Sequence, residues 1–137
     1  MVADRPLTIH DGAHNPAGAE ALAQALPEVV GERRPLVLVA SVLDDKDAAG
    51  MLGALAPRFD QAVFTRCANP RALSPATLES LSATVAGPPS ETVTEPRAAM
   101  ERARAIAGPG GAVVAAGSIY LIADLVRGEV QSRASTL

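Results

Sequence analysis

The sequence predicts an α/β protein in which a mainly parallel sheet lies between two layers of helices. Short apolar runs alternate along the 137 residues with segments of helical periodicity. Two of these runs, residues 36–40 (LVLVA) and 112–116 (AVVAA), are apolar throughout, as is typical of strands covered on both faces. A hydrophobic content of 48% with 20% charged residues suits a single domain with a real core and excludes a disordered chain. We therefore expect three layers, α/β/α, with five strands in the order βαβαβαβαβα.

The first strand is expected at residues 7–10, where a short apolar run ends in polar residues. A helix is expected over residues 16–26, because Asn15 suits the N-cap position and Pro16 the first helical position. Four apolar residues in this helix recur at the spacing of one helical face; these are Ala19, Leu22, Ala23 and Leu26.

The middle of the chain predicts two more strands, at residues 36–40 and 61–65, each followed by a helix. Residues 47–55 form the helix after the first of them, and Ser74 with Pro75 opens the helix after the second. The side chains expected to point inward from these two helices are Met51, Leu52, Leu55, Leu78 and Leu81.

The last third contains a weak strand candidate at residues 91–93, a helix at 95–106, the strand at 112–116 and a final helix at 119–126. The inward side chains of the first helix are expected to be Ala99, Met100, Ala103 and Ile106. We expect the domain to comprise residues 1–128, and residues 129–137 to form a frayed tail.

Composition excludes several classes of protein. The formal net charge of −3 and the absence of a basic run argue against a nucleic-acid surface. The single cysteine, Cys67, excludes a disulfide framework and a thiolate metal site, and suits a reducing compartment. No apolar stretch approaches the roughly 18 residues of a membrane span, and residues 1–10 lack the apolar core of a signal peptide. We therefore expect a cytoplasmic location.

In a parallel sheet, ligands bind beyond the carboxyl ends of the strands, so the first loop to consider is HDGAHNP at residues 10–16. Backbone amides at a helix start form an anion site, Asp11 could bind a sugar hydroxyl, and His14 could contact a phosphate. In the simpler alternative, Asn15 caps the helix and Asp11 braces the turn. His10 and His14 have the spacing of a helical zinc site, but the glycine and proline between strand and helix make this a turn, so we expect no metal site.

Two further loops carry charge after buried strands. Lys46 lies among three aspartates and could bind a carboxylate, although a solvated acidic turn with Asp47 as N-cap explains the same residues. Arg66 and Arg71 could clamp an anionic substrate, or they could be ordinary surface arginines.

The loop after the last strand begins with Gly117 and Ser118, and Ser118 would cap the final helix with or without a ligand. The one tyrosine, Tyr120, could be buried or lie at the site. The sequence contains no G-x-x-x-x-G-K-[ST] phosphate loop, and the glycines at 108, 110 and 111 precede a strand instead of opening a helix, which excludes a dinucleotide fingerprint there.

Four segments in this order resemble motifs of folylpolyglutamate synthases, including the bifunctional dihydrofolate synthases of bacteria. Residues 11–16 (DGAHNP) are similar to the most specific of these motifs. Residues 43–47 (LDDKD), 70–74 (PRALS) and 117–121 (GSIYL) resemble the family's L-x-DKD, PRA(x)S and GSLYL segments. The family pattern has a glycine near position 41, where this chain has serine.

The resemblance covers only the C-terminal domain of these enzymes, a Rossmann-like domain of the Mur ligase superfamily. It implies that the five parallel strands belong to a sheet of six, of which the first strand is absent from this chain. It also implies that the P-loop, the magnesium ligands and most of the pterin site lie on an N-terminal domain that is absent here. On this basis we expect the isolated chain to be inactive.

By the same resemblance, the parent enzyme is an ATP-dependent ligase that adds L-glutamate to folate or dihydropteroate. Asp11 and Asn15 would contact the nucleotide, and His14, with Asp11, would act at the phosphates. Lys46, Ser118 and Arg71 would bind the glutamate carboxylates. The expected cofactors are ATP and magnesium, held mainly by the P-loop domain, and no nucleic acid or membrane is expected as a partner.

Two alternatives remain open at this point. The chain could be a stand-alone, non-catalytic binding module with a Rossmann-like fold. It could also be the C-terminal domain of another Mur-type amide ligase, although such domains usually carry a lysine or arginine in place of the DGAH residues.

Overall fold

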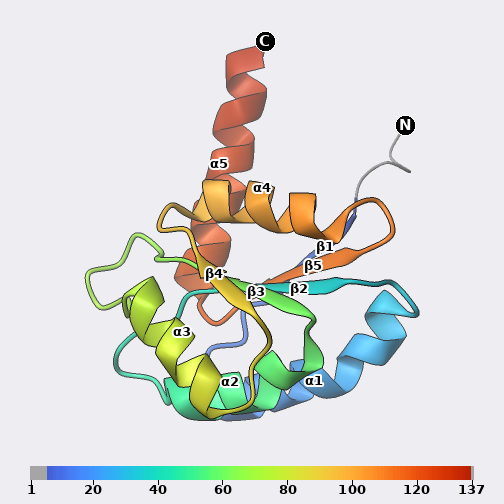
Figure 1. The fold of residues 1–137 in the computed structure, drawn as a ribbon. Coiled ribbons are helices and arrows are strands. Elements are labelled where there is room, and N and C mark those ends of the chain that lie inside the picture. Colours follow the sequence, from blue (N-terminus) through green and yellow to red (C-terminus); the bar gives the residue numbers. More distant parts are fainter. Residues whose placement is uncertain (1–5, 137) are drawn as a thin grey trace.

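The computed structural model describes residues 6–136, and from residue 128 onward it describes the helical backbone alone. The five strands form one sheet with the order β1-β5-β2-β3-β4, and all neighbouring strands are parallel. Their bounds are β1 Leu7–His10, β2 Leu36–Ala40, β3 Gln61–Phe64, β4 Ser90–Thr92 and β5 Ala112–Ala116. The predicted α/β class and the alternation of strands and helices are confirmed (Figure 1).

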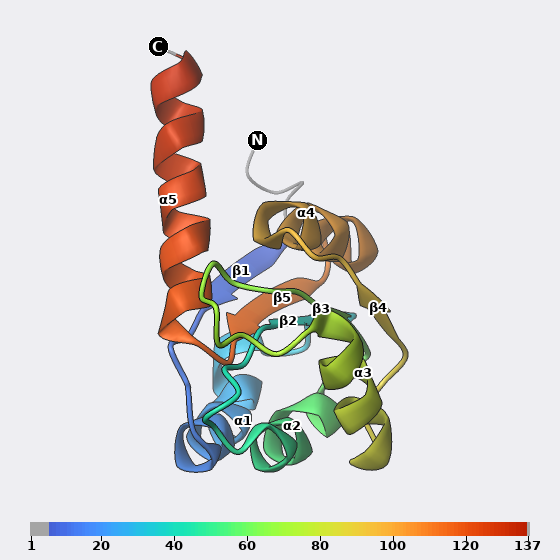
Figure 2. The ribbon, with the colours of Figure 1, turned by 90° about the vertical axis from the view of Figure 1, so that its left-hand side faces the viewer.

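Helices cover both faces of the sheet, as the fully apolar strands require. The helices are α1 Pro16–Val30, α2 Ala48–Leu55, α3 Pro75–Thr84, α4 Pro96–Ala107 and α5 Ile119–Thr136, with the short 3₁₀ turn η2 at Ala56–Arg58. One layer holds α1, α2 and α3, and the other holds α4 and α5 (Figures 1 and 2). Strands β2 and β5 occupy the middle of the sheet, and every residue in them is buried.

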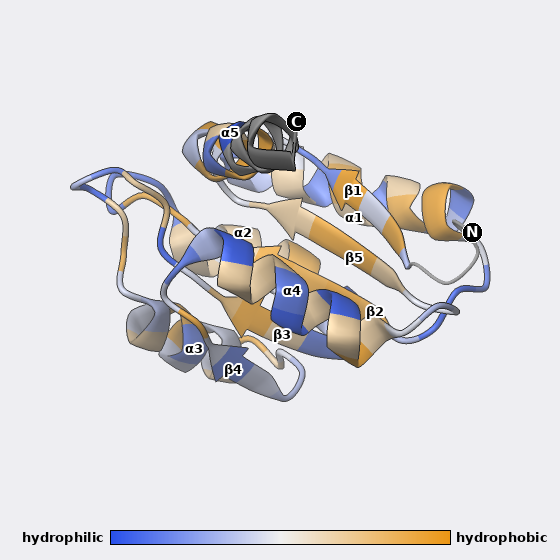
Figure 3. Cartoon of the chain, turned by 90° about the horizontal axis from the view of Figure 1, so that it is seen from above, coloured by the Kyte–Doolittle hydropathy of each residue, from blue (hydrophilic) through white to orange (hydrophobic). Residues whose placement is uncertain are grey.

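The side chains of the central strands alternate between two cores. Leu38 and Val114 contribute to the core under α1 and α2, whereas Val39 and Val113 contribute to the core under α4 and α5. This alternation is the two-residue period of a strand, and it gives each face of the sheet its own apolar core. The central strands are drawn mostly in the hydrophobic colours in Figure 3.

Two helices end later than the sequence predicts. Helix α1 was expected to stop before Pro27 but continues to Val30, which is buried, and the N–H of Gly31 then bonds to the Pro27 carbonyl. Helix α5 was expected to stop at Val126, but it runs to Thr136. A proline in the last turn and a single glycine at 128 lower helix stability without breaking the helical path; a glycine costs about 1 kcal/mol relative to alanine.

Residues 1–5, which include much of the segment judged to lack a signal peptide, and residue 137 lie outside the described residues. Among the helices of residues 6–136, none combines the length and apolar character that crossing a bilayer demands.

A surface ion pair joins β4 to α4 and gives a test of local electrostatics. The Arg102 guanidinium donates two hydrogen bonds to the Glu91 carboxylate, at 2.8 and 3.0 Å, and these bonds lower the pKa of Glu91. Replacing Arg102 by glutamine is expected to raise the Glu91 pKa toward its ordinary value, as followed by carboxyl ¹³C NMR. Because the folded-state pKa is lowered, the pair stabilises the fold above the unfolded-state pKa, and this contribution is lost as pH falls through the folded-state pKa. An unchanged Glu91 titration in the variant would contradict this account.

Candidate functional site

A pocket of about 280 Å³ lies at the carboxyl edge of the sheet. Loops that follow β1, β2, β3 and β5 meet there because parallel strands end on the same side. The residues that line it are His14, Leu43, Asp45, Lys46, Asn69, Arg71, Gly117, Ser118, Ile119 and Tyr120.

The loop after β1 is shaped by its own side chains. Asp11 Oδ1 accepts a hydrogen bond from the N–H of Ala13 at 2.8 Å, and Asn15 Oδ1 accepts one from the N–H of Gly18 at 2.7 Å. Asp11 therefore braces the turn and Asn15 caps α1, as the simpler of the two interpretations predicted. His14 is exposed, with Nδ1 3.1 Å from the Gly12 carbonyl oxygen, and it lies on the wall of the pocket.

The loops after β2 and β3 are joined by one antiparallel bridge, between Leu43 and Ala72. The N–H of Asp44 bonds to the Arg71 carbonyl at 2.7 Å, and the N–H of Leu73 bonds to the Val42 carbonyl at 2.9 Å. The Arg71 guanidinium also pairs with Asp44 at 3.3 Å and with Asp45 at 3.2 Å. Arg71 is thus held in place, and part of its charge is already balanced within the protein.

Lys46 is the cation of the pocket whose charge is not balanced by a neighbour. Its side chain is half-buried, and with the described side chains of residues 6–127 it forms no ion pair within 4 Å. Asp47 beside it caps α2 by accepting the N–H of Gly50 at 2.9 Å. The acidic turn predicted as the simpler alternative therefore exists, but it leaves the ammonium group free to meet an anion.

The loop after β5 brings the start of α5 to the pocket. Ser118 is buried, and its Oγ accepts the N–H of Tyr120 at 3.0 Å, so it caps the helix as expected. Ile119 and Tyr120 are 56% and 44% exposed at the pocket wall. An apolar and an aromatic surface thus adjoin the polar groups of the pocket.

Four of the six predicted site residues come together in this pocket: His14, Lys46, Arg71 and Ser118. Asp11 and Asn15 lie in the same loop as His14 but do not line the pocket. The sequence did not single out Asp45 or Asn69, and it left Tyr120 open. The signal that could have found Asn69 is its position in the loop after β3, which the parallel topology places beside the other three loops.

A shared zinc site at His10 and His14 was rejected from the sequence. Among the side chains that the structure describes, those of residues 6–127, no group of three or more His, Cys, Asp or Glu residues could hold a metal ion.

Comparison with known proteins places the chain in a family. Residues 1–119 match the family model described as Mur ligase, glutamate ligase domain. The chain is 54% identical over 68 residues, half of its length and 14% of the relative, to the dihydrofolate synthase/folylpolyglutamate synthase of Mycobacterium tuberculosis. The chain therefore spans only a small part of the curated relatives it matches.

Two solved structures have the same fold. The Mycobacterium tuberculosis folylpolyglutamate synthase complexed with ADP and AMPPCP has a TM-score of 0.74 and 38% identity, over 86% of this chain and 28% of that one. The Yersinia pestis bifunctional folylpolyglutamate synthase/dihydrofolate synthase complexed with AMPPNP and a Mn ion has a TM-score of 0.79 and 28% identity, over 90% of this chain and 28% of that one. By the length of the family match and by its fold, the chain belongs to the glutamate ligase domain family of Mur ligases.

Proposed function

We propose that this chain is the C-terminal domain of an ATP-dependent ligase that adds L-glutamate to folate or dihydropteroate. In this proposal the domain binds glutamate and closes over the nucleotide. The observation that carries it is the convergence of His14, Lys46, Arg71 and Ser118, from four separate loops, on one pocket at the carboxyl edge of the sheet.

The chemistry of the pocket suits an acidic amino acid. The unpaired ammonium of Lys46 can bind one carboxylate. Asp45, whose charge is shared with Arg71 at 3.2 Å, offers a carboxylate to the amino group. Ser118 Oγ accepts the N–H of Tyr120 and lies 4.0 Å from Cys67 Sγ, and its hydroxyl proton can be donated either to that sulfur or to a ligand. A ligand with two carboxylates and one amine therefore meets complementary groups.

In this proposal the nucleotide binds at the part of the pocket formed by the loop after β1, where His14 lies. The relatives of known structure are complexed with ADP, AMPPCP or AMPPNP, which supports a nucleotide for the whole enzyme. The exposed imidazole of His14 can donate a hydrogen bond to a phosphate, and Asp11 has a second carboxylate oxygen, Oδ2, beyond the one that braces its loop. The magnesium that accompanies ATP is assigned to the P-loop domain, where it would neutralise phosphate charge.

In the proposed reaction, ATP phosphorylates a carboxylate of the folate, and the amine of glutamate attacks the acyl phosphate to form an amide and release phosphate. This domain supplies no covalent nucleophile. Its residues hold the glutamate amine near the reacting carbon and exclude water, so positioning and electrostatic stabilisation are its contribution.

A titration tests the binding part of this proposal. We expect L-glutamate to produce saturable ¹⁵N amide shifts at Lys46, Arg71 and Ser118 of the labelled chain, and ADP to shift residues near His14. L-Glutamine, which lacks one carboxylate, serves as the control and is expected to bind more weakly. Equal shifts with both amino acids, or none with either, would refute the glutamate assignment.

A second measurement tests the need for another domain. Folate- and glutamate-dependent ADP release by the isolated chain is expected to be absent, because the chain has no phosphate-binding P-loop. Robust turnover by the chain alone would overturn that part of the proposal.

A further inference from the structure

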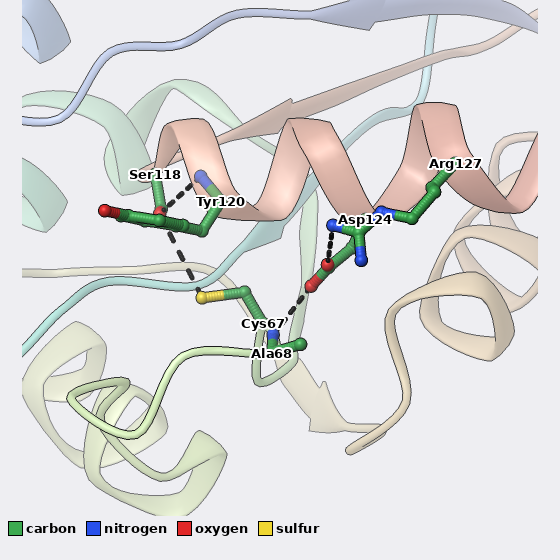
Figure 4. A network of polar contacts seen from close by, with 6 residues as sticks. All are labelled: Cys67, Ala68, Ser118, Tyr120, Asp124 and Arg127. Atoms are coloured by element: carbon green, nitrogen blue, oxygen red, sulfur yellow. Dashed lines mark hydrogen bonds and ion pairs between the residues drawn. The ribbon is translucent and has the colours of Figure 1, made fainter.

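A hydrogen bond between two residues that do not line the pocket, Ala68 and Asp124, ties the loop after β3 to helix α5. The N–H of Ala68 donates to Asp124 Oδ2 at 2.6 Å, across 56 residues of sequence. The other carboxylate oxygen of Asp124, Oδ1, pairs with Arg127 at 2.9 Å (Figure 4). The Asp124 side chain is only 12% exposed, whereas Ala68, which donates to it, is exposed.

Further hydrogen bonds lead from this part of the loop to the pocket. The carbonyl of Cys67 accepts the N–H of Asn69 at 2.8 Å. The Asn69 side chain in turn accepts the N–H of Arg71 at 2.8 Å. Both Asn69 and Arg71 line the pocket. Ala68, which bonds to Asp124, is therefore close in the chain to two residues of the pocket wall.

The far end of this loop is held by other contacts: Arg71 pairs with Asp44 and Asp45, and its carbonyl accepts the N–H of Asp44. Apart from the bond to Asp124, the hydrogen bonds that Ala68 and Asn69 form with described residues lie within the loop. Cys67 is buried, but Arg66, Ala68 and Pro70 are exposed, so side-chain burial anchors a single residue. Cys67 is held by its N–H, which donates to Ser41 Oγ at 3.0 Å. Asp124 supplies the corresponding acceptor for the N–H of the next residue, Ala68.

We propose that Asp124 is a positioning residue: its carboxylate holds Ala68 against α5 and thereby sets the place of Asn69 in the ligand pocket. Asn69 in turn helps to place Arg71, together with Asp44 and Asp45. The effect on ligand binding rests on the proposed function, whereas the effect on the loop does not. The property required of residue 124 is a hydrogen-bond acceptor at the position of Oδ2.

Three variants separate this role from a general effect on folding. Asp124→Ala removes the acceptor, Asp124→Asn keeps an acceptor oxygen without the charge, and Arg127→Ala removes the ion pair but leaves the bond to Ala68. Each variant of the full chain is examined by amide hydrogen exchange, by the ¹⁵N resonances of Asn69 and Arg71, and by titration with L-glutamate.

We expect Asp124→Ala to speed exchange of the Ala68 amide by about tenfold or more, to move the Asn69 and Arg71 resonances, and to weaken L-glutamate binding about five- to tenfold. Asp124→Asn and Arg127→Ala are expected to stay within about twofold of the wild type in both exchange and affinity. If Asp124→Ala does not fold, the asparagine and Arg127 variants decide, because each must then retain the wild-type Ala68 exchange.

Other results overturn the proposal. An Asp124→Ala chain with unchanged Ala68 exchange and unchanged Asn69 and Arg71 resonances excludes positioning. If Asp124→Asn has the same effect as Asp124→Ala, the negative charge matters and not the acceptor. If Arg127→Ala has the same effect as Asp124→Ala, the ion pair matters and not the bond to Ala68. Failure of the wild-type chain to bind L-glutamate overturns the proposed function alone, since the exchange and resonance measurements still judge the loop.

Discussion

Replacing Gly117 by alanine is expected to lower the free energy of unfolding by about 3 kcal/mol and to distort the pocket. Gly117 has φ +110°, in a region that residues with a Cβ rarely adopt. An added Cβ would lie 2.5 Å from the carbonyl oxygen of Ser41, a backbone atom that cannot turn aside. The N–H of Gly117 also bonds to the Ala13 carbonyl at 3.0 Å, so a shift of residue 117 reaches the loops after β1 and β2 together.

Urea denaturation measures this effect, with Gly110→Ala as the matched control. Gly110 is also a loop glycine next to β5, but its added Cβ would meet only the Arg34 carbonyl oxygen, at 3.9 Å, and no positive φ applies there. The control is expected to change stability by less than about 1 kcal/mol. Equal stability of the two variants would show that the close approach of Gly117 to Ser41 does not constrain the fold.

The sequence predicted the interior of the fold better than the ends of its helices. The strands at 36–40 and 112–116 have the predicted bounds because they are apolar runs with polar or turn residues on both sides. Helix starts were also predicted well, since Asn15 and Ser74 each cap a helix through the side chain. The end of α1 was missed because burial of Val30 outweighs the loss of one backbone hydrogen bond at Pro27.

The candidate site was predicted at the level of loops, but its contacts were not. Parallel topology alone places the residues after each strand at one edge, and this accounts for the meeting of His14, Lys46 and Ser118. The pairing of Arg71 with Asp44 and Asp45 depends on the path of two long loops. The bond from Ala68 to Asp124 depends in addition on where α5 crosses the sheet, and neither property has a local signature in the sequence.

Ser41 has a role that the sequence did not suggest. Its Oγ accepts the N–H of Cys67 at 3.0 Å, and its carbonyl oxygen lies against Gly117. The Ser41 side chain thus binds the loop after β3. Its carbonyl oxygen lies so close to Gly117, in the loop after β5, that an added Cβ would clash there. Position 41 therefore links three of the loops that surround the pocket.

Replacing Lys46 by alanine is expected to weaken L-glutamate binding about 10- to 100-fold, while the urea midpoint stays close to that of the wild type. A hydrogen bond between charged groups contributes about 1.5–3 kcal/mol, which corresponds to this range of affinity. Stability should hardly change, because Lys46 has no ion-pair partner among the described residues. Isothermal titration calorimetry of the folded chain measures the affinity, and Lys46→Arg is expected to recover part of it by restoring the charge.

The matched control for the loss of one positive charge is Arg33→Ala. Arg33 is exposed in the loop that precedes β2, at the opposite edge of the sheet from the pocket. If general electrostatic attraction governs binding, both variants weaken it alike and added salt abolishes the difference from the wild type. If the Lys46 ammonium contacts a glutamate carboxylate, only Lys46→Ala loses affinity for L-glutamate. If that carboxylate is the one that L-glutamine lacks, the same variant loses less affinity for L-glutamine than for L-glutamate. Equal affinities of Lys46→Ala and wild type for L-glutamate would show that Lys46 does not contact the ligand.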